Sequence, residues 1–219
     1  MILEENSKLV MIGDSITDCG RARTEFGKVG DGEGRDGFGN GYVNLINAII
    51  TSKTPELKLR IINKGISGNT VRDLKDRWQK DVLNMNPDYL AIKIGINDVW
   101  RRYDRFLIPE IHIHAKEYED TLIFLIDQVK GLKKLILITP YLIDDNLNNS
   151  MRKDMDELGD VVKRLASKNN AILVDTQKAF DKYLEVNHSF TLAGDQVHPN
   201  TIGHMIIARA FLAAIDYSF

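Results

Sequence analysis

Short runs of apolar residues recur along the chain, and each ends at a glycine, a proline or a polar turn. A run of this length that is apolar throughout is typical of a strand buried on both faces, because no side of it meets solvent. Strands of this kind are predicted over residues 8–13, 59–65, 89–95, 134–140 and 171–176.

Between these runs, hydrophobic residues recur every three or four positions, which places them on one face of a helix. Helices are therefore predicted over residues 41–52, 70–86, 114–131, 152–169 and 200–216. Trp78 falls on the apolar stripe of the second of these helices, so we expect its indole in the core.

Strands that alternate with helices predict an α/β fold, because each crossover helix covers one face of a parallel sheet. We expect a three-layer α/β/α architecture with a five-stranded parallel sheet, as in flavodoxin, and a chain of 219 residues fits one domain over 1–219. In such sheets, functional sites lie beyond the carboxyl ends of the strands.

Residues 20–41 interrupt this alternation, since they hold eight of the 16 glycines and show no periodicity. Long loops in compact domains are usually functional or mobile, so we expect this glycine-rich loop near the site. A solvated surface insertion is the alternative. The only large apolar residues of the loop are Phe26, Val29 and Phe38, which favours a small, polar substrate over a long acyl chain.

Composition narrows the function classes. The net charge is only −2, which argues against a nucleic-acid partner or an anionic membrane surface. Cys19 is the one cysteine, so no intrachain disulfide forms, and we expect it to be a small buried residue without a histidine partner. No stretch approaches the roughly 18 apolar residues of a membrane span, and the first residues are acidic rather than basic, so a cytoplasmic location is expected.

Four short polar stretches stand where strands or helices begin and end. "GDS" (13–15), "SGNT" (67–70) and "GIND" (95–98) follow the first three predicted strands, and "DQVHP" (195–199) precedes the last helix. Because the carboxyl ends of parallel strands share one edge of the sheet, we expect these stretches to meet there.

Together these stretches contain the groups that acyl transfer needs. Ser15 supplies a hydroxyl nucleophile and His198 a base, while Asp195, three residues earlier, can orient the imidazole. The backbone N–H of Gly68 and the side-chain amide of Asn97 are donors for an oxyanion. No metal or other cofactor is needed for this chemistry.

The four stretches, in this order, resemble the conserved blocks of the SGNH (GDSL-type) hydrolase superfamily, over essentially the whole chain. The resemblance implies that Ser15 is the nucleophile and that its N–H also serves the oxyanion hole with Gly68 and Asn97. It implies likewise that Asp195 and His198 are the acid and the base.

Longer stretches are similar to one branch, the intracellular SGNH acetylxylan esterases: "GDSITDCGRAR" (13–23), "NKGISGNTVRDLK" (63–75), "GINDVWRRYD" (95–104) and "VHPNTIGHMIIARAF" (197–211). This similarity implies removal of acetyl groups from xylo-oligosaccharides and assembly as a homo-oligomer. One departure is Ile16, which stands where the GDSL motif has leucine. Both residues are apolar.

Four further residues are candidates for substrate binding. Asp14 either contributes to the site or braces its loop, and Asn69 either bonds within the site or caps the helix that begins at 70. Trp100 and Tyr103 form either a wall for a sugar ring or a packing contact. The arginines of "RRYDR" (101–105) are interpreted as a solvated or subunit-contact segment.

Parts of the sequence also fit other functions. Within the hydrolases, a broad-specificity short-chain esterase or a lysophospholipase-like enzyme is the alternative. "GDSITD" also fits the G-D-x-x-D of binuclear metallophosphoesterases, but no histidine precedes Gly13 and Thr70 follows Asn69 where a histidine would be expected. A non-catalytic phosphate-binding module is disfavoured, because neither glycine-rich phosphate-binding signature is present.

Overall fold

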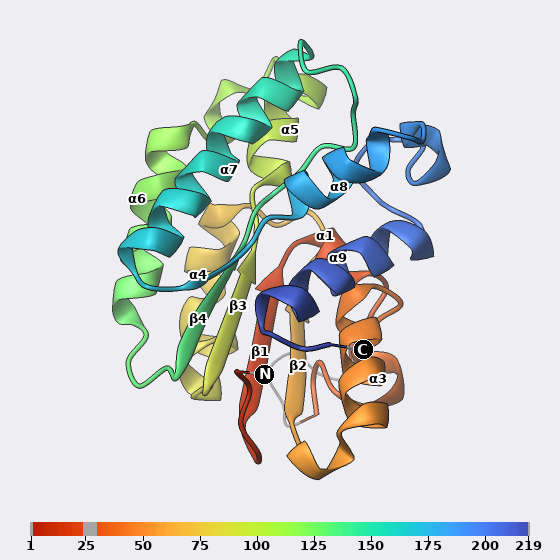
Figure 1. Ribbon diagram of the computed structural model, residues 1–219. Helices are drawn as coiled ribbons and strands as arrows, with labels where there is room; N and C mark the ends of the chain where they lie inside the picture. The colour runs from red at the N-terminus through yellow and green to blue at the C-terminus, as the bar shows by residue number, and fades with distance from the viewer. Residues whose placement is uncertain (1, 24–29, 219) are drawn as a thin grey trace.

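A parallel sheet of five strands forms the centre of the molecule (Figure 1). The computed structural model describes residues 2–23 and 30–218. The strands lie in the order β2-β1-β3-β4-β5. Their bounds are Lys8–Gly13 for β1, Arg60–Gly65 for β2, Tyr89–Lys93 for β3, Lys134–Ile138 for β4 and Ile172–Val174 for β5. The predicted five-stranded parallel sheet is confirmed.

Helices cover both faces of this sheet, as expected. On one face α3 (Tyr42–Lys53) packs against α9 (Thr201–Ala214). On the other, α6 (Ala115–Gln128) lies between α4 (Val71–Asp81) and α7 (Ser150–Lys168), as Figure 1 shows. The three-layer α/β/α fold is therefore confirmed. No helix among the described residues is long and apolar enough to cross a bilayer.

The sequence pattern did not predict four of the helices. Two are single turns, α1 (Ser15–Asp18) and α2 (Gly34–Gly37). The other two, α5 (Ile96–Asp104) and α8 (Thr176–Leu184), begin within three residues of a strand. Each is only nine residues long, so its apolar stripe spans fewer than three turns and is a weak signal in the sequence.

One predicted helix is also shorter than expected. The helix expected over 70–86 ends at Asp81, and a 3₁₀ turn over Leu83–Met85 follows it. Trp78 is 2% exposed and lies in the core, as the apolar stripe predicted.

The register of the sheet brings the ends of three strands to one level. Gly13 at the end of β1 pairs with Gly65 of β2 on one side and with Lys93 of β3 on the other. From β1 the chain runs outward to β2, whereas from β3 it runs the other way, to β4. The loops after β1 and β3 therefore diverge, which opens a crevice at this point of the rim.

The glycine-rich loop is anchored by charges that are buried beside the end of β2. Asp31 is 2% exposed and accepts hydrogen bonds from Lys64 (2.7 Å) and Arg21 (2.8 Å), both also buried. Burial raises the pKa of Asp31, but these two cations outweigh that effect and hold it below its usual range. This part of the loop is thus packed rather than solvated. Residues 24–29, with Phe26 and Val29, lie outside the described residues.

Candidate active site

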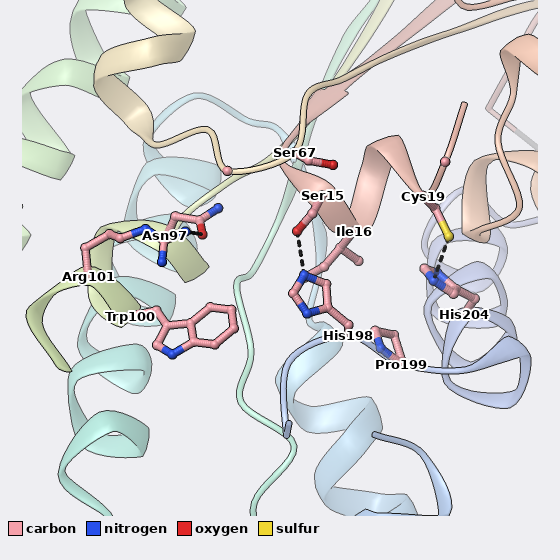
Figure 2. Close-up of a pocket in the computed structure, with 12 residues that line it drawn as sticks. Ser15, Ile16, Cys19, Ser67, Asn97, Trp100, Arg101, His198, Pro199 and His204 are labelled. Atoms are coloured by element: carbon pink, nitrogen blue, oxygen red, sulfur yellow. Dashed lines mark hydrogen bonds between the residues drawn. The ribbon is translucent and has the colours of Figure 1, made fainter. Parts of the chain in front are cut away.

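Three side chains from distant parts of the sequence form a continuous chain of hydrogen bonds (Figure 2). The Ser15 Oγ lies 2.8 Å from His198 Nε2, and His198 Nδ1 lies 2.6 Å from Asp195 Oδ2. A carboxylate can only accept, so Nδ1 carries the ring proton and Nε2 is left to accept the proton of the serine hydroxyl. This is the arrangement in which imidazole acts as a general base.

Asp195 is fixed by the segment that it begins. Its second oxygen, Oδ1, accepts hydrogen bonds from the backbone N–H groups of Val197 (3.0 Å) and His198 (2.8 Å). Burial raises the pKa of Asp195, but the bonds from the His198 ring and from these two N–H groups outweigh it, so the pKa lies below its usual range. The carboxylate therefore stays ionised and acceptor-only at neutral pH.

Ser15 stands at a sharp turn from strand to helix. β1 ends at Gly13, and α1 begins two residues later at Ser15. A Cβ on Gly13 would lie 2.3 Å from the carbonyl oxygen of Lys93, so only glycine allows so close an approach. The turn thus directs the Ser15 hydroxyl away from the end of the sheet and toward His198 (Figure 2).

The buried side chain of Asp14 stabilises this turn. It is fully buried, and its Oδ1 caps α1 by accepting a hydrogen bond from the N–H of Ile16 (3.0 Å). Burial raises the pKa of Asp14, and the positive charge of Lys93 partly offsets that rise. Asp14 does not line the cavity above Ser15, so its position fits the bracing role rather than contact with a substrate.

Three groups at the site can donate hydrogen bonds to an oxyanion: the backbone N–H groups of Ser15 and Gly68 and the side-chain amide of Asn97. Within the described part of the chain, no hydrogen bond occupies the N–H groups of Ser15 and Gly68. Gly68 has a φ of +84°, in the left-handed region that favours glycine, and a Cβ there would meet open space. Backbone conformation rather than bulk thus explains this glycine. Asn97 follows β3 in the first turn of α5, and its side chain lines the same cavity.

A cavity of about 620 Å³ lies over the serine. It is lined by Ser15, Ile16, Cys19, Gly20, Ser67, Gly68, Asn97, Trp100, Arg101, His198, Pro199 and His204. The indole of Trp100 lies 5.8 Å from the His198 ring and forms one wall (Figure 2). The mixture of polar and apolar groups suits a polar substrate that carries a small acyl group.

Two of the substrate-binding candidates point elsewhere. The hydroxyl of Tyr103 donates to Asp154 Oδ2 (2.6 Å), outside the cavity. The side chain of Asn69 accepts a hydrogen bond from Arg77 Nε (2.7 Å) and does not reach the cavity either. Asn69 does not cap α4, because Thr70 is the N-cap residue. Of the four candidates, only Trp100 lines the cavity.

The sequence pattern did not place Arg101 at the site, because the arginines of "RRYDR" were interpreted as a solvated or subunit-contact segment. Its side chain is 20% exposed and lines the cavity, with Nη2 donating to Asn97 Oδ1 (3.1 Å). The spacing contains a signal for this contact, since residues four apart on a helix are neighbours on its surface.

Cys19 has a histidine partner after all. Its Sγ lies 3.3 Å from Nε2 of His204, 185 positions away in the sequence. Nδ1 of His204 accepts from the N–H of Tyr42 (3.2 Å), so Nε2 carries the proton and donates to sulfur. Burial, with the nearby positive charge of Lys93, lowers the pKa of His204 to about 4. His204 is thus a neutral donor, and burial raises the pKa of the Cys19 thiol, so this pair does not form a reactive thiolate.

The carboxylates of the G-D-x-x-D pattern do not converge on one point. Asp14 caps α1, whereas Asp18 accepts hydrogen bonds from the N–H (3.0 Å) and hydroxyl (2.7 Å) of Ser67. No group of three or more histidine, cysteine, aspartate or glutamate side chains in residues 2–23 and 30–218 is placed to hold a metal ion. Both aspartates therefore have structural partners in this fold.

Comparison with known proteins agrees with this geometry. The model of the GDSL-like lipase/acylhydrolase family matches residues 11–206. An acetylxylan esterase from Geobacillus stearothermophilus is 49% identical over 221 aligned residues, which cover 100% of this chain and 98% of that protein.

Solved structures extend the similarity to the fold. A catalytic mutant of Axe2, an acetylxylan esterase from G. stearothermophilus, has a TM-score of 0.95 at 48% identity and covers 100% of this chain and 98% of its own. LAE5, an alpha/beta hydrolase enzyme from the metagenome of Lake Arreo, has a TM-score of 0.93 at 48% identity, with 99% and 98% covered. The Axe2 structures include catalytic mutants in which a serine, an aspartate or a histidine is replaced by alanine. The chain belongs to the GDSL-like lipase/acylhydrolase family.

Proposed function

We propose that this protein is a serine esterase that removes acetyl groups from acetylated xylo-oligosaccharides, with Ser15, His198 and Asp195 as its catalytic triad. The observation that carries the proposal is the hydrogen-bond chain from Asp195 through His198 to Ser15, at the floor of a cavity with free backbone donors. The catalytic mutants of Axe2 support it, because they concern the same three residue types.

In the first half of the reaction, Ser15 Oγ attacks the carbonyl carbon of the ester while His198 Nε2 takes the hydroxyl proton. Asp195 stabilises the imidazolium that forms. The carbonyl oxygen becomes an oxyanion, which the N–H groups of Ser15 and Gly68 and the amide of Asn97 stabilise. As the carbon–oxygen bond breaks, the imidazolium returns its proton to the leaving sugar oxygen, and an acetyl group remains on Ser15.

In the second half, water takes the place of the alcohol. His198 accepts a proton from the water as the water oxygen attacks the acetyl carbonyl. The oxyanion forms again and accepts hydrogen bonds from the same donors. Collapse of this intermediate releases acetate and returns the proton to Ser15 Oγ. No cofactor enters either half.

The choice of substrate rests on the relatives and on the cavity. The acetylxylan esterase that is 49% identical aligns with the whole chain, including every segment around the site. In this chain Trp100 offers an aromatic face to a sugar ring, and Ser67 offers a polar contact to a sugar hydroxyl group.

A broad-specificity short-chain esterase, or a lysophospholipase-like enzyme, is the alternative to test. Rates would be compared on acetylated xylo-oligosaccharides and on aryl acetate, butyrate and palmitate esters. A steep preference for the acetylated sugar is expected. Equal or better activity on long acyl chains would contradict the proposal, and acetyl esters hydrolysed regardless of the alcohol would point to the broad esterase.

Two further parts of the proposal concern the setting of the enzyme. A cytoplasmic location and assembly as a homo-oligomer are inferred from the similarity to intracellular acetylxylan esterases. Light scattering of the purified protein tests the second, and a mass equal to one chain would contradict it.

A further inference from the structure

The orientation of the Asn97 side-chain amide decides whether it can stabilise an oxyanion. A carboxamide can rotate by half a turn with almost no change of shape, and only one of the two orientations turns an N–H toward an oxyanion. The other would place the carbonyl oxygen there and repel the negative charge. The side chain is 2% exposed, so water does not select the orientation.

Two neighbours of Asn97 distinguish its amide nitrogen from its oxygen. Nδ2 donates to the backbone oxygen of Asn69 (2.9 Å), and Oδ1 accepts from Nη2 of Arg101 (3.1 Å). A carbonyl can only accept and a guanidinium can only donate. A rotated amide would set oxygen against oxygen and N–H against N–H, so both hydrogen bonds would be lost.

These contacts leave one donor of Asn97 for the reaction. Nδ2 has two hydrogens, of which the oxygen of Asn69 takes one, while the other has no acceptor among the described residues. The positively charged guanidinium that donates to Oδ1 also draws electron density from the amide, which makes the remaining N–H a stronger donor.

Arg101 is itself held in place. It lies one helical turn after Asn97 on α5, and its Nη1 pairs with Asp104. Its guanidinium also lies over the ring of Trp100, 5.5 Å from the centroid. Figure 2 shows the side chain reaching along the cavity wall to Asn97. A guanidinium already held by Asp104 and Trp100 loses little further freedom when it binds the amide.

We propose that Arg101 is a positioning residue for the oxyanion hole: it fixes the Asn97 amide with Nδ2 toward the reacting carbonyl. This inference rests on the proposed esterase function. Arg101 does not contact the substrate in this proposal. The effect of Arg101 on the rate depends entirely on the orientation of Asn97.

A double-mutant cycle on the hydrolysis of an aryl acetate tests this dependence. Asn97→Ala should lower kcat by about 10²–10³, as loss of one oxyanion donor does. Arg101→Met, which keeps the apolar stem, should lower kcat by at least about tenfold and leave KM within about twofold, because the lost interaction belongs to the transition state. In the Asn97→Ala background, Arg101→Met should have almost no further effect.

Two additional variants make the outcome specific. Arg102→Met removes the same charge from the same helix, but Arg102 faces Asp154 (3.4 Å), so kcat should stay near wild type. Arg101→Lys retains a donor without the planar fork and should give an intermediate kcat. If Arg101→Met does not fold, as judged by its thermal unfolding, the cycle is run with Arg101→Lys.

The results separate this inference from the proposed function. Equal loss of kcat from Arg101→Met in both backgrounds, or a raised KM with unchanged kcat, would overturn the positioning role and leave the esterase intact. A wild-type protein with no ester hydrolysis, or a fully active Ser15→Ala variant, would instead refute the proposed function.

Discussion

The two sides of the cavity are held in place by different means. On the nucleophile side, the turn with Ser15 packs beside β2, where Asp31 binds Lys64 and Arg21 out of contact with solvent. On the base side, the side chains of Asp195 and His198 are 43% and 46% exposed.

On the base side, the side chains of Asp195 and Asn200 bond to residues close to them in sequence. Among the described residues, the Asp195 side chain bonds only to Val197 and His198, and Asn200 caps α9 by accepting from the backbone of its first turn. The nucleophile side, in contrast, depends on two ion pairs of Asp31, whose partners Arg21 and Lys64 lie 10 and 33 positions away in the sequence. Changes on the base side should therefore reduce activity alone, whereas changes on the nucleophile side should reduce stability as well.

The largest effect is expected for the base. His198→Ala removes the acceptor for the Ser15 proton and should lower kcat by about 10⁴ or more, as in other serine triads. The thermal midpoint should change little, because the ring is half-exposed. His188→Ala, at an exposed histidine that does not line the cavity, is the matched control. A folded His198→Ala enzyme with near-normal turnover would rule out this residue as the base.

Asp195→Asn tests the orientation of that base. The new NH₂ group would face Nδ1 of His198 and favour the tautomer with the proton on Nε2, which cannot accept from Ser15. We expect kcat to fall by about 10²–10⁴, with the free energy of unfolding nearly unchanged at neutral pH. Steady-state kinetics and urea unfolding measure the two quantities. Normal kcat would mean that another residue orients His198.

Asp31→Ala tests the nucleophile side. It leaves Lys64 and Arg21 buried without their carboxylate, and removal of one partner from a buried ion pair typically costs about 3–5 kcal/mol. Urea unfolding should show a loss of this size together with lower activity. Glu33→Ala, in the same loop, removes a more exposed pair with Arg60 and should cost less than about 1 kcal/mol. Equal losses in both variants would contradict the contrast between the two sides.

The smallest effect concerns pH. Burial lowers the pKa of His204 to about 4, whereas an unfolded histidine has a pKa of about 6.5. Between these values the unfolded chain binds a proton that the folded chain excludes, so the free energy of unfolding falls as the pH drops from about 6.5 to 4. His204→Asn should flatten this dependence by up to about 3 kcal/mol. Parallel curves for the two proteins would show that His204 does not contribute.

Much of the fold could be predicted from the sequence, because its signals are local. Strands buried on both faces are mostly apolar, and the long helices show one apolar stripe. The short α5 and α8 carry their apolar stripes over fewer than three turns, so they were missed. That the chain is one domain over 1–219 stays a prediction.

For the site, sequence order and strand ends predicted which stretches would meet. The structure brings Ser15, Gly68, Asn97 and His198 around one cavity, with Asp195 behind His198, and their roles stay predictions until the variants are measured. The sequence did not reveal the Cys19–His204 contact, because the partners are 185 positions apart and meet only when α9 packs beside α3. Nor did charge pattern alone indicate that Asp31 and Lys64 are buried.

The central claim is that Ser15 attacks the ester, and covalent labelling tests it most directly. The protein would be incubated with a fluorophosphonate, which phosphonylates activated serines, and the adduct located by peptide mass spectrometry while esterase activity is followed. We expect a single adduct at Ser15, loss of activity in proportion to labelling, and no adduct in the His198→Ala variant. An adduct on another residue, or full labelling of Ser15 with activity retained, would contradict the account.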